Sequence, residues 1–169
     1  MPRIRPLEVE EAGPRAREAI EAHLAQGYRL TNEKKTLLHN ATAFEAIEAK
    51  SYELDRELQR LVGKRAADLF EYAVSAENDC LVCSAYFIRL LKSHGITDIG
   101  SYRFTPQESL LMEYGRAMAR APKAVPDGLF ERLRAEFSEE TIVVLTAMGA
   151  MMIANNYFND ILRVDPQEI

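Results

Sequence analysis

Apolar side chains recur at intervals of three and four residues along most of the chain, and no stretch alternates between apolar and polar residues for long enough to make a β-strand. Phe44, Ile47, Leu54, Leu58 and Leu61 illustrate this spacing. Eight glycines and seven prolines among 169 residues are fewer than average, so few turns interrupt the chain. The pattern therefore predicts an all-α fold, a bundle of helices.

Residues that cap helices mark the expected ends of these segments. Thr105 followed by Glu108 is a capping-box sequence, and Ser138 stands ahead of the last apolar segment. Asp79 is a candidate N-cap for a helix that Gly95 would end. We expect helices at residues 12–24, 41–61, 65–77, 80–94, 106–120, 127–135 (capped by Asp127) and 139–162.

Length and charge narrow the classes of protein. A chain of 169 residues suits a single domain over residues 1–169. Its net charge of −5, without a basic stripe, argues against nucleic acid or an anionic membrane as a partner. The longest apolar run, residues 142–154, is shorter than the ~20 residues of a membrane span. No apolar run follows the first basic residues, so we expect no secretory signal and a cytoplasmic protein.

The two cysteines, Cys80 and Cys83, form one C-x-x-C motif with four open interpretations. A zinc site needs about four ligands, and no pair of histidines is spaced to complete it. A structural disulfide would close a very short loop in a reducing compartment. The pair could also be two buried core thiols. Redox chemistry is favoured, because thiols three residues apart at a helix N-terminus can form a disulfide and unpaired N–H groups there stabilise a thiolate.

Position along the helix assigns a first set of roles. Cys80 lies nearer the helix N-terminus and is, on that ground, the expected nucleophile. His94 follows Cys83 by about three helical turns, or ~16 Å, too far to serve that sulfur directly. We expect His94 to interact with the dipole at the helix C-terminus. The sequence shows no nucleotide-binding or metal-binding motif, so we expect neither a cofactor nor a metal.

Residues 68–83, DLFEYAVSAENDCLVC, resemble the core motif of the carboxymuconolactone decarboxylase superfamily. Within that superfamily, the resemblance is to the AhpD-like alkylhydroperoxidase branch. Ser75, Asn78 and the cysteine pair have the family's spacing, and Gly95 falls where its motif helix ends. Residues 36–40 and 155–162 resemble two further family segments. The resemblance covers most of the chain, with the C-x-x-C core at about residues 41–120.

This resemblance implies an all-helical protein that forms trimers or hexamers and reduces hydroperoxides through its cysteine pair. It implies that Cys83 attacks the peroxide and Cys80 resolves the intermediate, the reverse of the assignment from helix position. Asp68 stands where the family has a relay glutamate, and Phe87 stands where it commonly has histidine. Two residues are candidates to substitute for the relay. Glu71 lies one helical turn beyond Asp68, and Tyr86 lies one helical turn beyond Cys83.

We therefore expect a thiol-dependent peroxidase or disulfide oxidoreductase of antioxidant defence, with a hydroperoxide substrate and an unidentified thiol reductant. One alternative is a non-catalytic helical module whose site has decayed. A carboxymuconolactone decarboxylase-like enzyme fits less well, because that branch does not use a cysteine pair. The segment 142–154 is apolar nearly all round and contains Met148, Met151 and Met152, which predicts a homo-oligomer.

Overall fold

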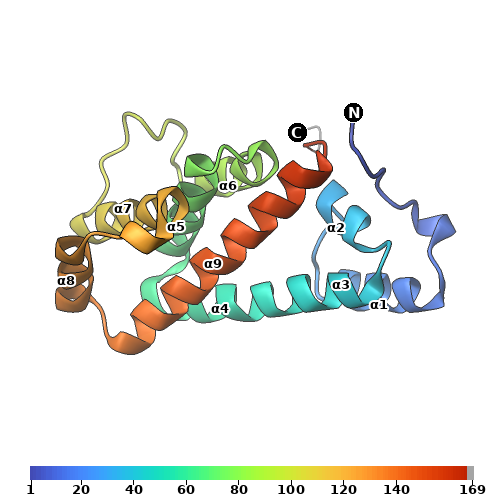
Figure 1. Cartoon of the computed structure of the whole chain (residues 1–169), viewed down its shortest axis with the longest axis horizontal. Coiled ribbons are helices and arrows are strands. Elements are labelled where there is room, and N and C mark those ends of the chain that lie inside the picture. Colours follow the sequence, from blue (N-terminus) through green and yellow to red (C-terminus); the bar gives the residue numbers. More distant parts are fainter. Residues whose placement is uncertain (167–169) are drawn as a thin grey trace.

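The computed structural model describes residues 1–166 except for the side chain of Ala49, and this part of the chain forms helices and no strand (Figure 1). The prediction of an all-α fold is confirmed. The helices are α1 (Pro14–Ala25), α2 (Asn32–Leu37), α3 (Ala41–Phe44), α4 (Lys50–Val62), α5 (Lys64–Glu77), α6 (Leu81–Ser93), α7 (Pro106–Arg120), α8 (Asp127–Glu136) and α9 (Glu139–Leu162), with 3-10 turns at Val9–Glu11 and Pro122–Ala124 and a π-helical segment at Glu45–Ala49.

Helix α5 is the centre of the fold, because it packs against α4, α6, α7 and α9. Its Phe70 is fully buried, and a Cβ atom placed on Gly115 of α7 would lie 2.9 Å from the Phe70 carbonyl oxygen. Helices α5 and α7 therefore approach each other more closely than a side chain at Gly115 would permit. Helix α9 crosses α4 diagonally, and α1 to α3 gather at the far end of α4 (Figure 1).

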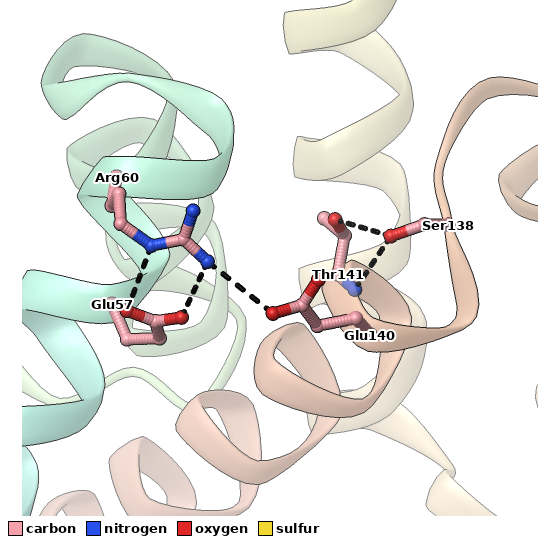
Figure 2. Close-up of polar contacts among 5 residues, drawn as sticks. All are labelled: Glu57, Arg60, Ser138, Glu140 and Thr141. Carbon is pink, nitrogen blue, oxygen red and sulfur yellow. Dashed lines mark hydrogen bonds and ion pairs between the residues drawn. The ribbon is translucent and has the colours of Figure 1, made fainter.

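A polar contact on the surface joins the C-terminal part of α4 to the start of α9 (Figure 2). Arg60 donates to both carboxylate oxygens of Glu57, at 3.0 and 2.6 Å, and to Glu140 at 3.3 Å. Ser138 caps α9, since its hydroxyl accepts a hydrogen bond of 3.2 Å from the backbone N–H of Thr141. The helix start expected at Ser138 is confirmed, and the ion pairs hold that start against α4.

Several helix ends differ from the sequence expectation for identifiable reasons. The segment 41–61 is interrupted by the π-helical turn, which carries Glu48 to a buried ion pair with Lys34 of α2, 3.1 Å apart. Helix α2 was not expected, because six residues are too few to show a helical period. The N-cap of α8 is Pro126, and Asp127 is the first helical residue, where its carboxylate still faces the positive helix end.

By length and composition alone, α9 is a helix that could cross a membrane. The core helix of a folded domain passes the same test, and α9 packs against α4, α5, α6, α7 and α8. Its buried residues include Leu145, Met148 and Met152, which join the main apolar core with Phe70 of α5. Its exposed apolar residues include Val143, Tyr157 and Ile161.

Candidate functional site

Cys80 takes part in two helix ends at once. Asp79, at the end of α5, has a left-handed conformation with φ 55°. The Asp79 N–H donates to Ala76 O at 3.2 Å and the Cys80 N–H to Ser75 O at 3.1 Å, which is the Schellman pattern of a helix C-terminus. The Cys80 carbonyl accepts from the Ser84 N–H at 2.9 Å and so begins α6. Cys80 is therefore the N-cap, and the expectation that Asp79 caps α6 is wrong.

The two sulfurs are free thiols that interact with each other. A hydrogen bond from the Cys83 thiol lowers the pKa of Cys80; burial opposes this shift, and the Cys83 backbone N–H adds to it. The same bond, together with burial, raises the pKa of Cys83. Within the pair Cys80 is therefore the more acidic thiol, and Cys83 holds its proton more strongly. The side-chain amide of Asn159 donates from Nδ2 to Cys83 Sγ at 3.3 Å.

A cavity of about 370 Å³ opens beside this pair, between α2, α4, α5, α6 and α9. Cys83 lines it, whereas Cys80 is fully buried. Acidity and access are therefore divided between the two sulfurs: Cys80 is the more acidic, and Cys83 is the one that a molecule in the cavity would meet. This division accounts for the opposite assignments that helix position and family resemblance give. The cavity lining also includes Asp68, Glu71, Tyr86 and Phe87, so the structure gathers the sequence-predicted residues in one place.

The acidic groups on the α5 side of the cavity have an unusual environment. Burial raises the pKa of Asp68, and the hydrogen bond from His94, 2.6 Å from Nε2 to Oδ2, opposes the shift. Burial, then repulsion from Asp55 and Asp68, raises the pKa of Glu71 well above its usual value. Oε1 of Glu71 is buried without a hydrogen-bond partner. Burial thus favours the neutral acid form of Glu71 at the cavity wall, and a neutral carboxylic acid is able to donate a proton.

His94 lies where the sequence expectation did not place it. It is the C-cap residue of α6, near the negative helix end, but its ring is held by the buried carboxylate of Asp68. The expectation of a dipole interaction therefore missed its partner. The contact joins residues 26 positions apart, and sequence spacing along one helix gives no sign of it.

The relay position Phe87 belongs both to the core and to the cavity. Its side chain is 6% exposed and packs in the main apolar cluster. The ring of Tyr86 meets it edge to face, with centroids 5.2 Å apart. Burial raises the pKa of Tyr86, so this phenol is a neutral group at neutral pH. Phe87 has no group that can transfer a proton, whereas Tyr86 lines the cavity and stays a candidate to substitute for the relay.

The α2 side of the cavity holds polar residues that sequence reasoning missed. Lys34 and Glu48 form a buried ion pair, and Lys34 lies over the ring of Tyr52, with Nζ 5.4 Å from its centroid. Burial, and repulsion by Glu48, raise the pKa of Glu33 to about 7. Glu33 and Lys34 lie on the short helix α2, Glu48 on the π-turn and Tyr52 on α4, and no sequence motif marks them. No group of three or more His, Cys, Asp or Glu suited to a metal ion occurs in the part of the chain described.

Comparison with known proteins supports the fold. A crystal structure of a protein of unknown function from Agrobacterium tumefaciens, provisionally described as the antioxidant defence protein AhpD, matches with a TM-score of 0.62. The match has 24% sequence identity and covers 74% of this chain and 92% of that one. No protein-family model and no curated protein matches the sequence. The chain thus has an AhpD-like helical fold, in agreement with the resemblance found in its sequence.

Proposed function

We propose that the protein is a thiol-dependent peroxidase of antioxidant defence, a disulfide oxidoreductase that uses Cys83 and Cys80. The observation that carries the proposal is the placement of Cys83, which both hydrogen-bonds the Cys80 sulfur and lines a cavity. A hydroperoxide in the cavity can reach Cys83, while Cys80 is near enough to resolve the product. The proposal places the protein in the cytoplasm, where thiols are kept reduced.

The first step needs a thiolate at Cys83 and a proton for the departing oxygen. When Cys80, the more acidic of the two thiols, is ionised, it takes the Cys83 proton, and Cys83 Sγ attacks the terminal peroxide oxygen. The O–O bond breaks, which leaves a sulfenic acid on Cys83 and an alkoxide. Glu71, kept neutral by burial, donates its proton to that alkoxide and releases an alcohol. Asp68 and its partner His94 lie in the same acidic group and can return a proton to Glu71.

The second step closes the pair. Cys80 attacks the Cys83 sulfenic sulfur, the S–O bond breaks, and the hydroxyl leaves as water with the Cys80 proton. The product is an intramolecular Cys80–Cys83 disulfide. A dithiol reductant then returns both thiols by exchange and becomes a disulfide itself.

Counting free thiols tests the proposal directly. Stoichiometric hydroperoxide should remove two thiols per chain, and a dithiol should restore both. Cys83→Ser should abolish peroxide consumption, whereas Cys80→Ser should consume one equivalent and stop at a sulfenic acid or a mixed disulfide. Leu81→Ala is the matched control, since Leu81 lies between the cysteines but is 73% exposed. If both thiols remain titratable after long exposure, the peroxidase proposal fails.

A non-catalytic oligomeric module is the second candidate, favoured by exposed apolar residues along α9, namely Val143, Tyr157 and Ile161. We propose that these residues contribute to contacts in a homo-oligomer, a trimer or hexamer, whichever function holds. Sedimentation at micromolar concentration tests this. A species of 19.1 kDa would contradict it.

A further inference from the structure

Asn155 of α9 is a buried polar residue at the cavity wall that the proposed reaction does not use. It is 9% exposed, it lines the cavity together with Cys83, and its Oδ1 atom has no hydrogen-bond partner among the described residues. A buried acceptor without a donor is costly, so this atom gains from a ligand that brings an O–H or N–H group. The χ2 torsion of asparagine is broad, so a small rotation presents Oδ1 to such a ligand.

The two other buried asparagines of α9 already have contacts within the protein. Oδ1 of Asn156 accepts from the hydroxyl of Ser75 at 3.4 Å, and Nδ2 of Asn159 donates to Cys83 Sγ at 3.3 Å. Neither of them belongs to the described lining of the cavity. Asn155 is therefore the asparagine of this helix whose amide is available to a molecule in the cavity.

Spacing along α9 puts Asn155 at the reactive end of the cavity. Asn159 follows it by four residues, about one helical turn, and touches the sulfur on α6. Met152 and Met148 precede it by about one and two turns, and both line the cavity. Phe87 of α6 belongs to the same apolar cluster as these methionines. The α9 wall of the cavity thus changes from apolar to polar toward the cysteine.

We propose that Asn155 holds the hydroperoxide for attack by Cys83, with its side-chain oxygen accepting a hydrogen bond from the peroxide O–H. An organic hydroperoxide matches this wall, because its apolar group can pack against Met148 and Met152 while its O–O–H group lies at Asn155. The oxygen that carries the hydrogen is the terminal one, which the sulfur attacks. The hydrogen bond therefore keeps the reacting oxygen near the sulfur. This inference rests on the proposed function, since it takes a hydroperoxide as the ligand.

Rates of thiol loss test this hydrogen bond in a Cys80→Ser background, where Cys83 is the one remaining cysteine. With tert-butyl hydroperoxide, Asn155→Leu should lower the second-order rate constant by about tenfold, the effect of one hydrogen bond. Asn155→Gln keeps an amide and should restore the rate to within about threefold. Ser51→Ala is the matched control, because Ser51 also lines the cavity but its hydroxyl already donates to the Glu48 carbonyl at 3.4 Å. It should leave the rate constant unchanged.

A reagent without a hydrogen-bond donor separates binding of the peroxide from damage to the site. Methyl methanethiolsulfonate also reacts with the Cys83 thiolate, but it has no O–H or N–H group to offer Asn155. Its rate should change by less than about twofold in Asn155→Leu, because no hydrogen bond is lost. A tenfold loss with both reagents would show that the substitution disturbs Cys83 through the packing of α9, and would overturn the proposal. An unchanged rate with the hydroperoxide would overturn it as well.

Binding without turnover makes this inference separable from the peroxidase proposal. In Cys80→Ser with Cys83→Ser no thiol can react, so tert-butyl hydroperoxide can be titrated to equilibrium and followed by NMR. The side-chain amide signals of Asn155 and the methyl signals of Met148 and Met152 should shift together, and Asn155→Leu should weaken the binding by about tenfold. Methionine shifts without a shift at Asn155, or no shift at all, would overturn the inference even if thiol counting supports a peroxidase. Shifts at Asn155 in a protein whose thiols resist peroxide would support the binding site and contradict the peroxidase proposal.

Discussion

His94 Nε2 lies 2.6 Å from Oδ2 of Asp68, which joins the C-cap of α6 to a buried carboxylate near the middle of α5. The side chain of Asp68 is 2% exposed, whereas that of His94 is 19% exposed. His94 is therefore the more solvent-exposed member of the pair, and it connects the buried Asp68 carboxylate to the surface. The pair also fixes α6 against α5, the two helices that carry the predicted catalytic residues.

Removal of this histidine should destabilise the fold. His94→Ala leaves the Asp68 carboxyl buried without its donor, and we expect a loss of about 1–3 kcal/mol in the free energy of unfolding by urea. His39→Ala is the control, because His39 is exposed and its ring hydrogen-bonds a backbone carbonyl, that of Arg5, instead of a buried carboxylate. Its loss should stay within about 0.5 kcal/mol. Equal small losses would show that the Asp68–His94 bond contributes little.

The left-handed backbone at Asp79 predicts an ordered response to substitution. Asp79→Val places a branched side chain at φ 55° and should cost about 1–2 kcal/mol. Asp79→Gly removes the steric strain of the left-handed conformation but increases the conformational entropy of the unfolded chain. These two effects oppose each other, so the net change in the free energy of unfolding should stay within about 1 kcal/mol. Thermal unfolding measures both. If Asp79→Val is as stable as the unsubstituted protein, the Schellman end of α5 is not rigid.

Substitution of Phe87 separates its two roles. Phe87→His should lower stability by about 1–3 kcal/mol, since it puts a polar ring into the main core. It should also speed peroxide-driven loss of thiols by about 10²-fold, because it restores a general acid–base group one turn from Cys83. Phe87→Leu should lose comparable stability without a gain in rate. A rate unchanged by histidine would mean that the ring does not reach the reacting atoms.

Glu33 should make stability depend on pH. Its pKa is about 7 in the native protein against an ordinary 4.5, so over this interval the native state binds a proton that the unfolded chain lacks. The contribution of this proton to the free energy of unfolding is therefore fully present below about pH 4.5. It decreases as the pH rises from 4.5 to 7, and above pH 7 it does not change further. The loss is about 3 kcal/mol at most. Urea unfolding of Glu33→Gln at pH 5 and pH 8 should show a correspondingly smaller difference.

The control for this pH effect is Glu45→Gln. Glu45 is exposed and pairs with Arg15 on the surface, so its replacement should leave the difference between pH 5 and pH 8 as in the unsubstituted protein. An unsubstituted protein that is more stable at pH 8 than at pH 5 would contradict the burial of a neutral Glu33.

The sequence was sufficient to predict those features that depend on residues close together in the chain. The capping box at Thr105 and Glu108 forms as expected, with both of its hydrogen bonds, because the groups are three residues apart. Asp68, Glu71 and Cys83 were found from a linear motif on two consecutive helices, and the structure places all three at one cavity.

Contacts between segments far apart in the chain could not be predicted from the sequence. The bond from Asn159 to Cys83 spans 76 residues, and the ion pair of Lys34 with Glu48 depends on a π-turn that interrupts a regular apolar pattern. Asp79 was misassigned because an aspartate before a helix is the usual cap, whereas here the preceding helix requires it in a left-handed conformation. Tertiary packing, which no single pattern reports, decided each of these.

The backbone of Cys80 is held from both directions, by Ser75 at the end of α5 and Ser84 in the first turn of α6. The backbone of Cys83 is likewise fixed within α6, so a disulfide can form by rotation of the side chains and not by movement of either backbone. Rotation of the Cys83 side chain toward Cys80 withdraws its sulfur from the Asn159 amide and from the cavity wall. Oxidation would thus empty one side of the cavity and release the amide, a local signature by which the redox state of the pair could be followed at α9.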